Sequence, residues 1–231
     1  MAEYPRIEVA SENAFIVYCG VEISGEMVGR VQRIDRAVRE RLGSVLLDTI
    51  PSYASLLVIY QADRINGSVM RVRLELCVTE VDDPEDRIEA SRLIALPVWY
   101  GTEAGADLPA LAEAKGMKPE EVIALHQERE YRVYAIGFAP GFAYLGEVDK
   151  RIAAPRLHTP RQKVPCGAVG IAERQTAVYP SESPGGWNLI GRCPLQMFDL
   201  NATEPMPVKA GDRVRFEPID RAQFLALGGE L

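Results

Sequence analysis

The segment from Tyr131 to Asp199 constrains the fold of this chain more than any other, because glycines and prolines interrupt it at short intervals. Eight of the 19 glycines in the chain lie between Gly137 and Gly191. Glycine allows backbone conformations and close approaches that other residues do not. The pattern predicts short strands joined by tight turns, as in a barrel or a sandwich, and indicates a surface shaped for a ligand.

The length and composition predict an ordinary soluble globular protein. A chain of 231 residues can form one large domain or two small ones, and 47% of it is apolar and 26% charged. The net charge of −7 argues against a general nucleic-acid or anionic-membrane partner, and no apolar run is long enough for a membrane span. Without a signal-peptide pattern or a C-x-x-C pair, we expect a cytoplasmic protein with reduced cysteines.

An acidic segment predicts the domain boundary. Residues 79–92, TEVDDPEDRIEASR, hold six acids and one proline, which is typical of a linker or exposed connection. We therefore expect a small α+β domain over residues 1–90 and a β-barrel domain over 91–231. In the first, strands are predicted at 14–21, 45–50 and 55–61 and a helix at 26–42, an order that suggests a ferredoxin-like domain.

The segment 69–81 is ambiguous from its residues alone. Val72, Leu74, Leu76 and Val78 alternate as in a strand, whereas Val69, Val72 and Leu76 have helical spacing. The second domain is predicted to begin with a strand, followed by two short helices and then short strands with Gly/Pro turns. It should end with a closing strand and a short helix. The first strand is expected at residues 93–100 and the closing strand at 208–218. The helices are expected at residues 107–115, 119–128 and 222–227.

Basic residues concentrate between Lys150 and Arg174, which carry six positive charges and one negative charge. This window sums to +5, so the rest of the chain sums to −12. A basic island on an acidic protein suggests a site for a carboxylate, a phosphate or an acidic partner surface. The alternative is a solvated basic face or a set of salt bridges.

The standard catalytic motifs are absent: the sequence has no P-loop, no G-x-S-x-G elbow and no H-E-x-x-H. Because there are only two histidines, no metal site is predicted. His126, at the end of a predicted helix, is the candidate general acid or base, with a packing or capping role as the alternative. Cys166 and Cys193 have no evident partner base, so neither is predicted as a nucleophile.

Two loops are candidates for anion binding. Prolines keep residues 155–167 extended, so Arg161 and Lys163 should point the same way and hold a carboxylate or phosphate, unless the loop is simply exposed. In the turn after Ser183, backbone N–H groups could form an anion-binding concavity, and Trp187 could stack on a ligand or plug the barrel. The predicted binding set is Arg161, Lys163, Gln175, Thr176, Ser183, Gly185, Gly186, Trp187 and Arg192.

A third loop, GFAPGFAYLG at residues 137–146, places aromatic residues between glycines and a proline. It could be an aromatic-walled loop beside a pocket, or a tight bend whose aromatic rings fill the core. The second interpretation is favoured for Phe138 and Phe142, and the role of the loop backbone stays open.

These motifs carry a family resemblance. The stretches HQEREYRVYAIGFAPGFAYLG and TPRQKVPCGAVGIAERQTAVYPSESPGGWNLIGRCPLQMFD, together with LLDTIPSYASLLVIY, resemble the family of the 5-oxoprolinase B subunits. That family includes KipI-type histidine kinase inhibitors and proteins labelled allophanate hydrolase subunit 1. The resemblance implies an α+β N-terminal domain, a cyclophilin-like β-barrel, and a helix at residues 69–81.

The resemblance also implies a function. We expect one component of a heteromeric enzyme that uses ATP, with Mg²⁺, to open 5-oxoproline to L-glutamate together with the A and C subunits of 5-oxoprolinase. The substrate would be a small anionic amide, and this component would be inactive alone. The alternative within the same family is a regulatory protein that binds and inhibits a sensor histidine kinase.

Overall fold

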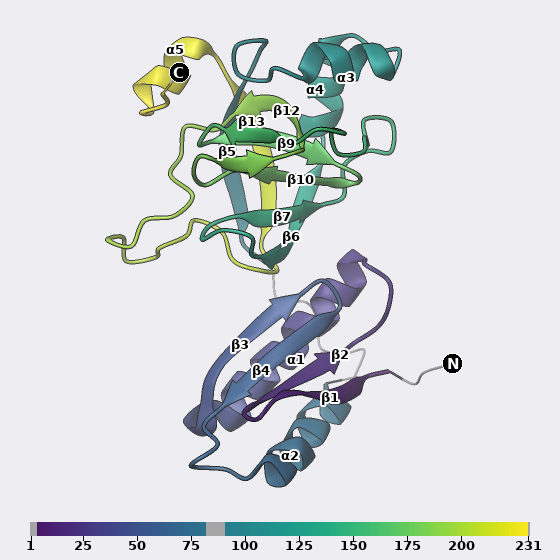
Figure 1. The fold of residues 1–231 in the computed structure, drawn as a ribbon, viewed down its shortest axis with the longest axis vertical. Coiled ribbons are helices and arrows are strands. Elements are labelled where there is room, and N and C mark those ends of the chain that lie inside the picture. The colour runs from purple at the N-terminus through teal and green to yellow at the C-terminus, as the bar shows by residue number, and fades with distance from the viewer. Residues whose placement is uncertain (1–3, 82–90, 231) are drawn as a thin grey trace. The chain divides into compact units, whose positions relative to one another are not determined.

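The computed structural model describes residues 4–81 and 91–230 (Figure 1). The chain forms two compact units, residues 1–91 and residues 92–231. The boundary falls one residue from the predicted one. The predicted linker itself lies largely outside the described residues.

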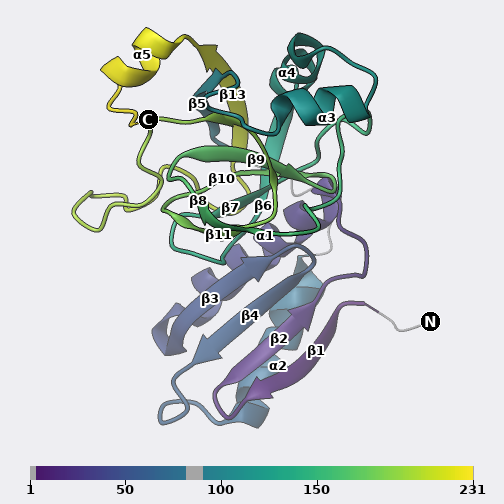
Figure 2. The same cartoon turned by 45° about the horizontal axis from the view of Figure 1, so that its top comes forward.

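The first unit is a four-stranded antiparallel sheet in the order β1-β2-β4-β3, with two long helices. Figure 2 shows both helices behind the sheet. Its elements are β1 (Arg6–Ser11), β2 (Ala14–Tyr18), α1 (Gly25–Leu42), the 3₁₀ turn η1 (Gly43–Val45), β3 (Leu46–Ser52), β4 (Ser55–Tyr60) and α2 (Gly67–Glu80).

Helix α1 follows from local sequence signals. The Ser24 hydroxyl accepts a hydrogen bond from Met27 N at 3.1 Å, which satisfies a free N–H group at the helix start. Val31, Ile34 and Val38 recur at helical spacing and are buried in the core of this unit. A cap followed by an apolar stripe explains why the predicted helix forms.

Residues 69–80 of the ambiguous segment are helical, as the resemblance implied. Helix α2 buries Leu74 and Val78 in the core, while Val69, Val72 and Leu76 are exposed on another face. The apparent strand alternation of Val72, Leu74, Leu76 and Val78 therefore mixes two faces of one helix. Apolar residues on both faces remove the amphipathic signal, which is why the residues alone left the segment ambiguous.

The order of elements differs from the β-α-β-β-α-β pattern of a ferredoxin-like domain. Strand β1 precedes the predicted first strand and pairs with it. Within residues 4–81, no strand follows α2. The unit is thus mixed α and β, as expected, and the ferredoxin-like assignment stays a prediction.

The second unit is a closed barrel in which seven strands follow one another in the order β10-β7-β6-β13-β5-β12-β9. Strand β13 pairs with β5 in parallel and with β6 antiparallel. The barrel strands are β5 (Leu93–Tyr100), β6 (Glu130–Ile136), β7 (Ala143–Gly146), β9 (Ala168–Ala172), β10 (Gln175–Val178), β12 (Asn188–Arg192) and β13 (Arg213–Ile219). The helices are α3 (Leu108–Ala114), α4 (Pro119–Gln127) and α5 (Arg221–Ala226).

A separate two-stranded ribbon accompanies the barrel. Strand β8 (Arg161–Val164) pairs with β11 (Ser183–Gly185), and Figure 2 shows the two side by side. The ribbon contains much of the predicted binding set. Among the helices within residues 4–81 and 91–230, none is long and apolar enough to cross a membrane.

Candidate functional site

A cavity of about 230 Å³ lies where the ribbon meets the barrel. Most of its lining is aromatic or comes from the glycine-rich turn. The lining residues are Phe138, Phe142, Tyr144, Arg156, Pro160, Tyr179, Pro184, Gly185, Gly186 and Trp187. Three members of the predicted binding set, Gly185, Gly186 and Trp187, therefore lie together on one wall.

The turn forms this wall because glycine lets it approach Tyr179. A Cβ atom on Gly185 would lie 2.4 Å from the Tyr179 hydroxyl oxygen, closer than real Cβ contacts allow. Burial raises the pKa of Tyr179. Tyr179 is therefore neutral at physiological pH, and its hydroxyl lies against the turn at Gly185.

Phe142 lies at the centre of the aromatic lining. Its ring meets those of Tyr179 and Trp187 nearly at right angles, at 82° and 88°, with centroids 5.3 and 5.6 Å apart. Edge-to-face packing of this kind is favourable between aromatic rings. Phe142 is buried, so the core-filling interpretation suits it.

Phe138 differs from that interpretation, because it is 63% exposed and lines the cavity. Its φ of 72° lies in the left-handed region, inside a turn closed by a 3.0 Å bond from Gly137 N to Phe142 O. This tight turn directs the ring out of the core, where it contacts Phe142 edge-on at 5.2 Å between centroids. The loop is both a bend and a cavity wall.

Arg156 brings a positive charge to the cavity. Its guanidinium carbon lies 6.0 Å from the centroid of the Trp187 ring, within range of a cation–π contact. In the part of the chain that the structure describes, no carboxylate forms an ion pair with it. The sequence placed Arg156 in the basic island but not in the predicted binding set.

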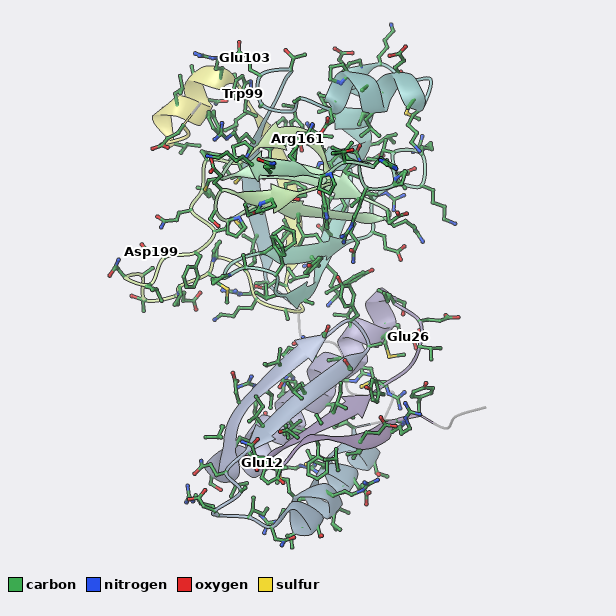
Figure 3. The ribbon with its side chains drawn as sticks, viewed as in Figure 1. Glu12, Glu26, Trp99, Glu103, Arg161 and Asp199 are labelled. Atoms are coloured by element: carbon green, nitrogen blue, oxygen red, sulfur yellow. The ribbon has the colours of Figure 1, made fainter. Side chains whose placement is uncertain are left out.

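Arg161 and Lys163, the predicted anion-binding pair, do not line this cavity. Arg161, labelled in Figure 3, forms an ion pair with Asp107 at the start of α3. Lys163 pairs with Glu182 at 3.0 Å and is 77% exposed. Each cation already has a carboxylate, so the structure gives them separate partners instead of one shared anion.

Three other predicted residues also lie outside the cavity lining. Gln175 sits opposite Gly146 in the pairing of β10 with β7, and Arg192 Nε donates to the Cys166 carbonyl at 3.0 Å. The buried Ser183 hydroxyl has no hydrogen-bond partner among the described residues. These residues lie on three different strands, β10, β11 and β12, and are close in the sequence without sharing one site.

His126 occupies the barrel interior, away from the cavity. It is fully buried, and its ring nitrogens contact Tyr100 Oη at 2.8 Å and Thr176 Oγ1 at 2.9 Å. The ring also stacks on Phe216 with centroids 4.5 Å apart. Burial lowers the pKa of His126 to about 3, so it is neutral at physiological pH.

With both nitrogens bonded and no access to solvent, His126 has the surroundings of a core residue. A general base must lie within hydrogen-bond reach of its substrate, and His126 does not line the cavity. We propose a structural role for His126 and Thr176 in place of the predicted catalytic and binding ones. The alternative of a packed histidine is the one that the geometry favours.

Sequence reasoning left open whether the loop that contains Tyr144 lies beside a pocket, and it placed Arg156 only in the basic island. It missed Tyr179, because this residue reaches the cavity through contacts with segments distant in the sequence. Within residues 4–81 and 91–230, no cluster of three His, Cys, Asp or Glu side chains could hold a metal ion. The site is therefore a small aromatic cavity with one guanidinium and several backbone groups.

Comparisons with known proteins agree with this architecture. The B subunit of 5-oxoprolinase from Bacillus subtilis (strain 168) is 37% identical over 229 residues, which cover 96% of this chain and 95% of that relative. The crystal structure of a conserved uncharacterized protein from Pyrococcus horikoshii is 42% identical, covers 95% of this chain and 100% of its own, and has a TM-score of 0.57.

A third relative is longer. The crystal structure of TTHA0988 is 36% identical with a TM-score of 0.78, and the match covers 90% of this chain but only 40% of that one. A family model described as carboxyltransferase domain, subdomain C and D, matches residues 5–208. Since this match spans most of the 231 residues, the chain belongs to the family of carboxyltransferase domains, subdomains C and D.

Proposed function

We propose that this chain is the B subunit of a 5-oxoprolinase complex, which opens 5-oxo-L-proline to L-glutamate. The observation that carries the proposal is the 37% identity, over nearly the whole of both chains, to a protein named as the B subunit of 5-oxoprolinase. The small aromatic cavity supports it, because such a volume suits a compact ring better than a large ligand. None of the relatives reported above is named as a kinase inhibitor.

The complex would also contain the A and C subunits, and this chain would be inactive alone. The name of the Bacillus subtilis relative, the B subunit of 5-oxoprolinase, supports the presence of further subunits. In the longer chain of TTHA0988, 60% of the residues lie outside the part matched here. We further propose that the complex works in the cytoplasm.

ATP supplies the activation that a stable lactam needs before its C–N bond can be hydrolysed. The described cavity does not fit ATP with Mg²⁺: it is below the roughly 300–1,000 Å³ typical of larger ligand pockets, and its lining has one cation and no carboxylate. We therefore place nucleotide binding on the other subunits. This chain would hold the amide substrate and exclude water with its aromatic walls.

The proposal is tested by assembling the chain with the A and C subunits and measuring glutamate released from 5-oxoproline in the presence of ATP. We expect release only when all three subunits are present. A complex of folded subunits that forms no glutamate would contradict the proposal.

A matched pair of variants tests the cavity in the same assay. Phe138→Ala removes an exposed cavity wall and should raise KM roughly twofold to tenfold. Leu200→Ala removes another exposed apolar side chain, one that does not line the cavity, so it should leave KM unchanged. Equal KM values for both variants would mean that the substrate does not bind in this cavity.

A further inference from the structure

Hydrogen bonds hold the backbone on both sides of Arg156. The Pro155 carbonyl accepts a hydrogen bond from Asn188 Nδ2 at 2.9 Å, and Leu157 N donates to the Gly186 carbonyl at 2.6 Å. These two bonds tie the backbone around Arg156 to the segment that carries Trp187. The constrained backbone therefore places the exposed Arg156 side chain beside the Trp187 ring.

Among the described residues, no carboxylate forms an ion pair with Arg156. Nearby, Arg161 is paired with Asp107 and Lys163 with Glu182. Among the described residues that line the cavity, none is acidic and Arg156 alone is basic. An unpaired guanidinium offers a planar fork of donors that matches a carboxylate, and such charge-assisted bonds are strong.

The rest of the lining restricts the body of the ligand. Phe138, Phe142 and Trp187 present ring edges and faces, and the turn adds Gly185 and Pro184. Aromatic walls favour a small flat ring and disfavour a second charge, because a charge would lose its hydration there without a partner. The cavity thus combines one anion-binding group with space for one small ring.

We propose that Arg156 binds the carboxylate of a small ring acid whose ring lies between the aromatic walls of this cavity. The inference builds on the proposed function, since 5-oxoproline is such an acid. It assigns substrate recognition to Arg156 in place of Arg161 and Lys163. Loss of one charge-assisted pair should weaken binding roughly tenfold to hundredfold.

The test uses Trp187 as an internal probe. The chain has two tryptophans, and Trp99 packs on Phe224 outside the cavity lining, so a Trp99→Phe parent reports on Trp187 alone. The full-length parent is titrated with three compounds by fluorescence and by calorimetry. These are 5-oxo-L-proline, pyrrole-2-carboxylate, which lacks the lactam, and 2-pyrrolidinone, which lacks the carboxylate.

We expect both acids to bind and to change Trp187 emission, and 2-pyrrolidinone to bind at least tenfold more weakly. In the parent background, Arg156→Gln should weaken both acids tenfold to hundredfold. Arg151→Gln is the matched control: Arg151 is exposed, is paired with Asp149 and does not line the cavity, so this variant should bind as the parent does. Circular dichroism establishes that each variant is folded.

The outcomes separate this inference from the proposed function. Unchanged affinity of Arg156→Gln for both acids overturns the inference, and so does the absence of heat and fluorescence change with either acid. Binding of pyrrole-2-carboxylate through Arg156 without binding of 5-oxoproline supports the inference and contradicts the proposed substrate. Glutamate production by a complex carrying Arg156→Gln at the parent KM supports the proposed function and overturns the inference.

Discussion

Lowering the pH from 7 to 5 should destabilise the barrel unit by about 2 kcal/mol, because His126 is buried in its neutral form. Burial lowers the pKa of His126 from 6.5 to about 3 in the folded protein. At pH values between these two pKa values, His126 binds a proton in the unfolded chain but not in the folded protein. The stabilisation is therefore fully present above pH 6.5 and is lost as the pH falls towards 3.

Between pH 7 and 5, the size of the loss in free energy of unfolding depends only on the pKa of His126 in the unfolded chain. At pH 5 the folded histidine is still neutral, whereas most unfolded chains carry the proton, and each full pH unit costs about 1.4 kcal/mol. Asp149 and Glu204 also have lowered pKa values, since both pair with basic side chains. Their protonation affects stability at more acidic pH, so the window from 7 to 5 isolates histidine.

Urea unfolding followed by tryptophan fluorescence measures this effect, because Trp99 and Trp187 both lie in the barrel unit. His158 is exposed and is the other histidine of the chain, so His158→Gln should retain the full loss of stability. His126→Gln should be less stable at pH 7 but should show little change down to pH 5. A wild-type free energy of unfolding that is equal at pH 7 and 5 would refute the reasoning.

Two further predictions compare pairs of residues. Gly185→Ala should weaken ring-acid binding in the fluorescence titration, because its Cβ would lie 2.4 Å from the Tyr179 hydroxyl. Gly137 does not line the cavity, and a Cβ there would meet nothing within 4 Å, so Gly137→Ala should bind normally. Equal binding by both would mean that the turn does not shape the cavity. In α2, Leu74→Ala should cost roughly 2–5 kcal/mol in unfolding followed by circular dichroism. The exposed Leu76→Ala should stay within about 0.5 kcal/mol, and a reversed order would contradict the assigned helix face.

The sequence by itself determined the elements that depend on local signals. The helix at α1 follows from a capping serine and apolar residues at helical spacing, and the barrel strands follow from short apolar runs between glycines and prolines. The acidic composition of residues 79–92 predicted a division close to the one observed. Each of these signals acts between residues close together in the chain, so a pattern can be read directly.

The tertiary structure decided which of the predicted site residues share a cavity. Arg161 and Arg156 look equivalent in the sequence. Asp107, which lies 54 residues before Arg161, forms an ion pair with Arg161, whereas Arg156 lines the cavity. The sequence allowed a catalytic role for His126, but in the fold its two ring nitrogens contact the hydroxyl groups of Tyr100 and Thr176. The burial of a side chain and its pairing with a charge depend on residues from distant segments of the sequence. They are therefore decided only when the barrel has brought those segments together.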